Sequence, residues 1–253
     1  MTRRAPALPW LEPGQAFPPL SSAWGAHDPA PGLLAAGGAL DVPTLMAAYS
    51  QGIFPWYSEG QPILWWSPDP RMVLQVANFR LHDSLRKPLF SGLRQQRIEI
   101  RFDHDFSAVI RHCAATPRHG QHGTWILPEM VAAYEALHRA GHAHSVEIWW
   151  DGELAGGLYC VNLGGMVFGE SMFSHRSNAS KMALAGLVAF CRQHGITTID
   201  CQQNTAHLAS LGGREIARSD FARHVHGALA TPAPAWRFLS VYWKHLLPAH
   251  EPT

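Results

Sequence analysis

Residues 145–174 read SVEIWWDGELAGGLYCVNLGGMVFGESMFS, three apolar runs separated by short turns. Asp151-Gly152 joins the first two runs, and an Asp-Gly pair between apolar segments is among the strongest short signals for a β-hairpin. A second turn, at Gly164-Gly165, separates the second run from the third. The stretch therefore predicts an antiparallel meander of three strands.

A helix and one more strand follow this meander. Leu184, Leu187, Val188 and Cys191 repeat at helical spacing, with Ser177 or Asn178 as the N-cap and Gly195 after the last turn. The next apolar segment, TTIDCQ at 197–202, predicts a short strand. A strand reached through a helix pairs in parallel, so we expect an α+β fold with a mixed sheet.

The chain before the meander divides into two parts. Residues 1–40 are rich in Pro, Gly and Ala, a short helix is expected over 43–51, and four prolines in 52–70 exclude long regular structure. Strand and helix signals resume after that point. We place a small N-terminal domain at 1–70 and a larger catalytic domain at 71–253.

Composition indicates a globular protein. Of the 253 residues, 47% are hydrophobic and 15% are charged. No window approaches the ~18 uninterrupted apolar residues of a membrane-spanning helix, and the N-terminus has no apolar run typical of a signal peptide. The four cysteines show no CxxC spacing. We expect a cytoplasmic protein that keeps off the membrane and holds reduced cysteines.

Common catalytic motifs are missing from the sequence. It has no Walker P-loop, no GxGxxG after a strand, no HExxH and no GxSxG, which argues against nucleotide hydrolysis and serine-hydrolase chemistry. His138, His142 and His144 have a spacing that could ligate a metal, but no carboxylate or cysteine lies near them in sequence. We therefore expect no metal site.

Polar residues gather where predicted strands end. Glu170 ends the third strand of the meander, SHRSNASK (174–181) leads into the helix, and Asp200, Gln202 and Asn204 follow the short strand. Such clusters often only cap helices. Two carboxylates ending separate strands, however, favour a pocket that selects a cation.

The net charge of +1 gives no sign of a nucleic-acid partner, but basic residues concentrate between Arg80 and Arg101. This segment is either a solvated helix face or a phosphate-binding patch.

Long blocks of the chain resemble the leucyl/phenylalanyl-tRNA–protein transferase family. The resemblance covers most of the sequence and is carried by PGLLAAGGALDVPTLMAAYSQGIFPWYSEGQPILWWSPDPRMVL, GTWI, GHAHSVEIW, ELAGGLY, FGESMFS, NASKMAL and IDCQQNTAHLASLGGREIAR. It implies a splayed sheet of the acyltransferase, or GNAT-like, type. It also implies transfer of Leu, Phe and less often Met from tRNA to proteins with N-terminal Arg or Lys, which marks them for N-degron degradation.

The resemblance assigns the reacting centre residue by residue. Asp200 and Gln202 would form the catalytic pair, while Glu170 or Asp200 would read the basic side chain of the acceptor. The aminoacyl ester is already activated, so neither a cofactor nor a metal is implied. The family usually acts as a monomer.

The resemblance also implies three substrate-binding regions. The apolar pocket for the donor side chain would be lined by Leu158, Val167, Leu184, Leu187 and Ile199. The terminal adenosine of the tRNA would stack on Tyr49, Trp56 and Trp125. Acceptor-stem phosphates would contact Arg80, Arg86 and Lys87, although Asp83 weakens this patch.

Two alternatives remain open from the residues themselves. A CoA-dependent N-acetyltransferase would have a similar sheet but needs a glycine-rich pyrophosphate loop at 174–181, a segment that contains no glycine. A noncatalytic adaptor could bind basic N-termini through Glu170 and Asp200. It would bind such peptides without any dependence on charged tRNA.

Overall fold

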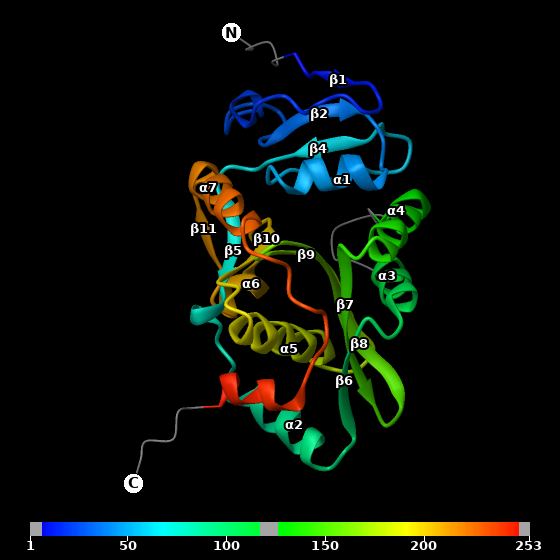
Figure 1. The fold of residues 1–253 in the computed structure, drawn as a ribbon, viewed down its shortest axis with the longest axis vertical. Coiled ribbons are helices and arrows are strands. Elements are labelled where there is room, and N and C mark those ends of the chain that lie inside the picture. Colours follow the sequence, from blue (N-terminus) through cyan, green and yellow to red (C-terminus); the bar gives the residue numbers. More distant parts are fainter. Residues whose placement is uncertain (1–6, 117–125, 248–253) are drawn as a thin grey trace.

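The computed structural model describes residues 7–116 and 126–247. A four-stranded sheet near the N-terminus has the order β1-β2-β4-β3, with α1 lying beneath it in Figure 1. The Asp41 side chain caps α1 by accepting a hydrogen bond from the Thr44 amide at 2.8 Å. The elements are β1 (Trp10–Leu11), β2 (Leu33–Gly37), α1 (Val42–Tyr49), β3 (Phe54–Pro55) and β4 (Leu64–Trp66).

A seven-stranded sheet forms the larger part, in the order β11-β5-β10-β9-β8-β7-β6. The predicted meander is present as β7, β8 and β9, and β10 runs parallel to β9, so the sheet is mixed as expected. The strands are β5 (Arg71–Gln75), β6 (Ile98–Phe102), β7 (Ala143–Trp150), β8 (Glu153–Leu163), β9 (Met166–Ser174), β10 (Thr198–Gln202) and β11 (Arg214–Ile216).

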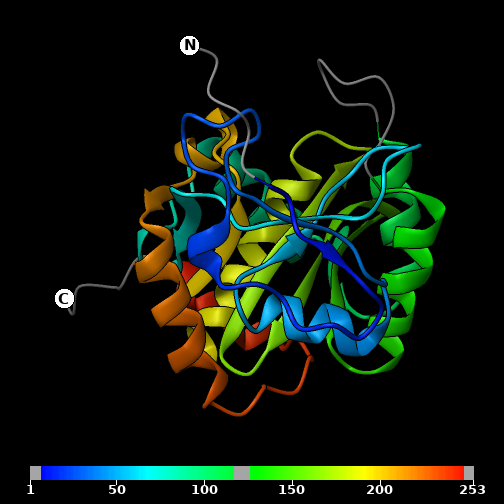
Figure 2. The same ribbon diagram turned by 90° about the horizontal axis from the view of Figure 1, so that it is seen from above.

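Helices cover both faces of this sheet. Figure 1 places α3 and α4 on one side of β7 and β8 and α5 on the other, while Figure 2 shows α7 at the opposite edge from α3 and α4. The helices are α2 (Asp83–Arg94), α3 (Phe106–Ala115), α4 (Pro128–Arg139), α5 (Ala179–Gln193), α6 (Ala206–Ser210) and α7 (Arg218–Leu229), with 3₁₀ turns η1 (Leu20–Ser22), η2 (Val76–Asn78) and η3 (Ser240–Leu246).

Alternate residues of the strands feed two separate cores. On β8, Tyr159 and Val161 join the core that also contains α1, α3, α4 and the small sheet, whereas Leu158 and Cys160 join the core around α5. This is the period-two alternation expected of a sheet covered on both faces. Any cavity that meets both sets of side chains must therefore pass through the sheet.

Some local structure differs from the sequence prediction. Asn178 occupies the N-cap position of α5, but its backbone is left-handed with φ 69° and its side chain makes no capping bond. The hydroxyl of Ser174 instead accepts from the Ser180 amide at 2.9 Å. The strands β5 and β11 were not predicted, because their three to five residues are too few to show a period. In the described residues, no helix is long and apolar enough to cross a membrane.

Candidate active site

Two β-bulges place polar side chains where β9 and β10 separate. The parallel register ends at the pair Phe168 and Asp200. On β9, Tyr159 faces Ser171 and Cys160 faces Gly169, so Glu170 is the extra residue of a bulge. Bulges re-aim side chains and are frequent beside active sites. Glu170 is therefore turned toward the gap between the strands.

The second bulge lies on β10. Its register with β5 shifts between Asp200 and Gln202, and Gln202 has a positive φ of 60°. A left-handed backbone at a residue other than glycine is uncommon and persists only when surrounding contacts hold it. Here the contact is a 2.9 Å hydrogen bond from the Gln202 amide to Oδ1 of Asp200.

A cavity of about 340 Å³ occupies this gap and meets both faces of the sheet. Its walls combine Leu158, Leu184, Leu187 and Ile199 from the α5 side with Glu170 from the opposite face. Further walls come from β3 and the residue after it, from the β10–α6 connection and from α6, namely Phe54, Pro55, Trp56, Gln203, Thr205 and Leu208. The cavity thus has an apolar end and a polar end.

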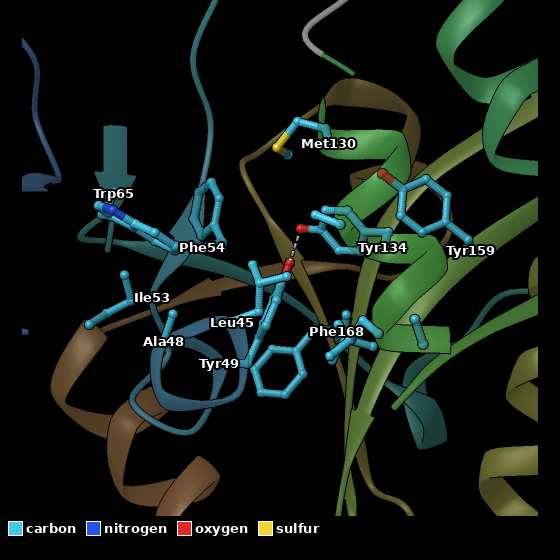
Figure 3. Close-up of a cluster of buried hydrophobic side chains, with 14 of the residues drawn as sticks. Leu45, Ala48, Tyr49, Ile53, Phe54, Trp65, Met130, Tyr134, Tyr159 and Phe168 are labelled. Carbon is cyan, nitrogen blue, oxygen red and sulfur yellow. Dashed lines mark hydrogen bonds between the residues drawn. The ribbon is translucent and has the colours of Figure 1, made fainter. Parts of the chain in front are cut away.

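The polar end is a chain of hydrogen bonds centred on Glu170. The Gln202 side chain donates from Nε2 to Oε1 of Glu170 at 2.8 Å, and the Tyr134 hydroxyl donates to Oε2 at 3.2 Å. Tyr134 is in turn hydrogen bonded to the hydroxyl of Tyr49, the bond dashed in Figure 3. Burial raises the pKa of Glu170 to about 8. The carboxyl is therefore poised to change its charge near neutral pH.

Asp200 is fully buried and paired. Arg71 donates to both of its oxygens, from Nε to Oδ1 at 2.8 Å and from Nη2 to Oδ2 at 2.6 Å. Oδ1 also accepts from the Gln202 amide. A carboxylate with these bonds has little capacity left for a substrate cation. Glu170 and Asp200 were both predicted to bind the basic side chain of the acceptor. Of these two, only Glu170 has no cation paired with it in the part of the chain that the structure describes.

The three predicted aromatic residues lie in different places. Trp56 is partly exposed and lines the cavity. Tyr49 has no exposed surface, packs against Phe168 at 5.1 Å between ring centroids, and belongs to the core in Figure 3. It offers no face on which a base could stack, so the stacking expected of it does not fit its burial. Trp125 falls outside the described residues.

Four of the five residues predicted for the donor pocket, Leu158, Leu184, Leu187 and Ile199, line the cavity. Val167 belongs to the same core around α5 as these four residues, but it is fully buried and does not line the cavity. Met172 from β9 and Leu208 from α6 complete the apolar wall, and neither was predicted from the sequence. No single-sequence pattern marks them, since they come from elements brought together only by the fold.

The basic residues lie away from the cavity walls. Arg80 follows η2 and is exposed, while Arg86 and Lys87 lie on α2. Asp83 is 3.0 Å from Arg86 and 3.9 Å from Lys87, which partly neutralises both. Arg80 and Lys87 are exposed and Arg86 is partly buried, and the ion pairs reduce the charge that the two residues of α2 present.

The histidines at 138 and 144 serve a separate cluster. Asp103, His138 and His144 each offer one ligand atom within 4.8 Å of the others. His144 Nδ1 is hydrogen bonded to Asp103 at 2.7 Å and His138 Nδ1 to the Ala143 carbonyl at 2.8 Å. The carboxylate partner, which sequence spacing did not reveal, comes from the end of β6. The cluster lies outside the cavity lining.

Comparisons with known proteins agree over nearly the whole chain. The family model described as leucyl/phenylalanyl-tRNA protein transferase matches residues 73–226, and the model of its N-terminal domain matches residues 38–69. A leucyl/phenylalanyl-tRNA–protein transferase from Polaromonas sp. is 64% identical over 97% of this chain and 96% of its own length. One from Paraburkholderia phytofirmans is 58% identical over 91% of this chain and 94% of its own.

Two solved structures match part of this chain at low TM-scores. A ribosomal-protein-alanine N-acetyltransferase from Brucella melitensis has a TM-score of 0.32 at 13% identity, covering 56% of this chain and 96% of that one. FemX has a TM-score of 0.41 at 11% identity, covering 72% of this chain and 70% of that one. The α+β fold with a mixed sheet is as predicted.

Proposed function

This chain belongs to the leucyl/phenylalanyl-tRNA protein transferase family, and we propose that Glu170 and Gln202 form the centre at which its two substrates meet. The enzyme is an aminoacyltransferase: it moves Leu or Phe from aminoacyl-tRNA to the α-amino group of proteins that begin with Arg or Lys. The product enters N-degron degradation. Less frequent use of Met is part of the proposal.

The observation that carries the assignment is the 2.8 Å bond from Gln202 Nε2 to Glu170 at the polar end of the cavity. Because the amide nitrogen donates to Glu170, the amide oxygen of Gln202 can accept a hydrogen bond from an incoming amine. An α-amine has a pKa of ~7.7 to 8.0, so a useful fraction is neutral without a strong base. Orientation rather than deprotonation is the main task of Gln202.

The chemical step exchanges an ester bond for an amide bond. The neutral amine attacks the ester carbonyl carbon, a C–N bond forms, and the C–O bond to the terminal ribose breaks. The proton lost by the amine ends on the ribose oxygen that leaves. Gln202, held by Asp200 through its backbone amide, keeps the amine aimed at the carbonyl. No external energy source enters this balance.

Glu170 would supply the charge that selects the acceptor. A guanidinium or ammonium entering the polar end favours the ionised carboxylate and lowers the raised pKa of Glu170. Asp200, already paired with Arg71, acts in this proposal through Gln202 rather than on the acceptor side chain. In this proposal Glu170 selects the acceptor side chain, and Asp200 aligns Gln202.

The apolar end would hold the donor side chain. Leu158, Leu184, Leu187 and Ile199 provide a wall of the right chemistry for Leu, Phe or Met. Trp56 at the rim offers a surface for the terminal adenosine, and the same role is proposed for Trp125. Because the cavity passes through the splayed sheet, donor and acceptor can approach from opposite faces.

The exposed cations Arg80 and Lys87 and the partly buried Arg86 would contact phosphates of the acceptor stem. We further propose that the protein acts as a cytoplasmic monomer. The proposed division into 1–70 and 71–253 is supported by the change from the small sheet to the large one between β4 and β5.

The test is a transfer assay with tRNA carrying radiolabelled leucine and two peptides that differ only in N-terminal Arg or Ala. We expect label on the Arg peptide alone. Gln202→Ala should lower kcat about 100-fold, as loss of an orienting polar contact in a closed site does. Gln193→Ala, an exposed amide at the end of α5, is the matched control and should keep full activity.

Each failure has its own meaning. Absence of label on both peptides would contradict the assigned transfer reaction. A parallel assay with acetyl-CoA as the donor would then test the acetyltransferase alternative. Binding of the Arg peptide without transfer would favour the adaptor. Full activity in Gln202→Ala would leave the reaction in place and overturn the site.

A further inference from the structure

Arg71 is a buried cation that joins the small sheet, the large sheet and α7. It begins β5 and has no exposed surface. Besides its two bonds to Asp200, it donates from Nη1 to the Gly52 carbonyl at 3.1 Å. Its guanidinium lies between two rings, 4.8 Å from the centroid of Phe54 and 4.5 Å from that of Phe221. Its plane and direction are therefore fixed from several sides.

This fixed guanidinium sets the position of the Asp200 carboxylate. A two-point contact defines the orientation of a carboxylate, which a single ammonium does not. Oδ1 of Asp200 then holds the amide of Gln202, whose left-handed backbone needs such support. The order of contact is Arg71 to Asp200, Asp200 to the Gln202 backbone, and the Gln202 side chain to Glu170.

Arg71 also gives the carboxylates of Asp200 and Glu170 different electrostatic environments. Asp200 and Glu170 lie on the same face of the sheet, and the charge of Asp200 acts to raise the pKa of Glu170 while that of Arg71 acts to lower it. With Arg71 present, Asp200 is neutralised within its own pair. A cation entering the cavity is then directed to Glu170 alone.

A third contact reaches the wall of the cavity. Phe54 and its neighbour Pro55 line the cavity next to Trp56, and Arg71 contacts the ring of Phe54 and the Gly52 carbonyl just before it. One side chain therefore supports the rim contributed by the small sheet and the bulge of β10. Phe54 and Pro55 are also held by their pairing with β4, so loss of Arg71 would chiefly release the bulge of β10.

We propose that Arg71 is a positioning residue of the transfer reaction, a clamp that touches no substrate and aligns Gln202 through Asp200. The inference rests on the proposed role of Gln202. It assigns to Arg71 an effect on the rate of transfer, beyond the stability that any buried ion pair affects when it is broken.

The experiment combines Arg71→Ala with added guanidinium ion, which can enter the space left by the side chain. We expect kcat to fall about 100-fold, because a misplacement of ~1 Å costs that much. The KM for leucyl-tRNA should stay within about threefold, since Arg71 contacts neither substrate. Millimolar guanidinium should restore at least a tenth of the wild-type kcat, whereas ethylammonium, which cannot make the two-point contact, should not.

Arg192→Ala is the matched control. Arg192 is a partly buried arginine that donates to the carbonyls of Val76 and His245, away from the cavity. Its loss should lower the melting temperature without lowering kcat, and guanidinium should leave kcat unchanged. This separates rescue of positioning from a general effect of the salt on an unstable protein.

Arg71→Lys tests the proposal if Arg71→Ala does not fold. This variant keeps a cation beside Asp200 but loses the two-point contact of the guanidinium, so kcat should fall at least tenfold in a folded protein. Wild-type kcat in either folded variant, with Gln202→Ala inactive, would overturn the role of Arg71 and leave the proposed site intact. Equal rescue by ethylammonium would also overturn it. Full activity of Gln202→Ala would instead overturn the proposed site.

Discussion

The hydroxyl of Tyr134 donates to Oε2 of Glu170 at 3.2 Å, which ties α4 to the bulge of β9. Tyr134 is fully buried, so this bond forms away from water, where an ionised carboxyl depends on its few donors. Besides burial, the pKa of Glu170 depends on residues from four elements: Tyr49 of α1, Asp200 of β10, Tyr134 of α4 and Arg71 of β5. Its behaviour with pH and with substitution follows from these contacts.

Folding should depend on pH through Glu170. Its pKa is about 8 in the folded protein against 4.5 for the free side chain, so the folded state binds more protons between these values. The contribution of protonated Glu170 to the free energy of unfolding is then full below about pH 4.5 and is lost as pH rises toward 8. Glu170→Gln cannot lose a proton, so its free energy of unfolding should gain on wild type across this window, by a few kcal/mol on the order-of-magnitude scale of such shifts. Urea unfolding at a series of pH values measures the difference, and a constant difference would contradict it.

Tyr134→Phe should weaken acceptor selection. The hydrogen bond from Tyr134 acts to lower the pKa of Glu170, so its loss leaves more of the carboxyl protonated at neutral pH. We expect a several-fold higher KM for the Arg peptide, on the scale of one hydrogen bond to a charged group, and partial recovery at higher pH. The measurement is KM for the Arg peptide across pH.

Tyr57→Phe is the control for this change. Tyr57 is also a buried tyrosine that bonds a carboxylate, but its partner is Glu129, 3.2 Å away on α4. It should leave the KM for the Arg peptide as in wild type. If both variants raise KM equally, a general loosening of the core rather than the Glu170 contact is responsible.

Much of the catalytic sheet could be predicted because its signals are local. The Asp151-Gly152 turn and the alternation of β8 define the meander, and the helical spacing of α5 defines the crossover. The bulges at Glu170 and between Asp200 and Gln202 could not be predicted, because each is a mismatch with a neighbouring strand. The sequence indicates that polar residues end these strands but not how they are turned.

Tyr49 and Arg71 illustrate the limit for single residues. An aromatic on a short helix is compatible with stacking on a base. Its burial results from Tyr134 and Phe168, which are far away in the chain. Arg71 follows a proline-rich loop and looks like a surface cation until Asp200 is placed beside it. The burial of both side chains depends on contacts with residues far away in the chain, and the hydrophobic periodicity of the sequence does not reveal such contacts.

The donor pocket should tolerate leucine better than phenylalanine when it is made smaller. Leu187 lines the cavity, so Leu187→Phe removes space at its apolar end. We expect kcat/KM to fall more for Phe-tRNA than for Leu-tRNA, by about 10-fold in the ratio, as one or two methylenes of misfit produce. Competition between the two charged tRNAs measures the ratio.

Val167→Ala is the control for the donor pocket. Val167 is buried in the core around α5 and does not line the cavity. Its truncation should lower stability by about 1 kcal/mol or more, as loss of core methyl groups does, with no change in the Phe to Leu ratio. A changed ratio would place Val167 in the pocket after all.

Binding of tRNA should improve when Asp83 loses its charge. Asp83 pairs with Arg86 and Lys87 on the exposed face of α2, and such pairs contribute only ~0 to 1 kcal/mol to stability. Asp83→Asn releases both cations for phosphates, so we expect a lower KM for leucyl-tRNA at low salt. The dependence of log KM on log salt should steepen by about one for each phosphate gained.

Asp220→Asn is the matched control on α7, because it frees Arg223 from a similar exposed pair at 3.0 Å. It changes the net charge by the same amount and should leave the KM for leucyl-tRNA and its salt dependence unaltered. Lys87→Ala should act in the opposite direction to Asp83→Asn and flatten the salt dependence. If the two neutralised aspartates lower KM equally, the gain comes from the overall charge of the protein, and α2 is not where the tRNA binds.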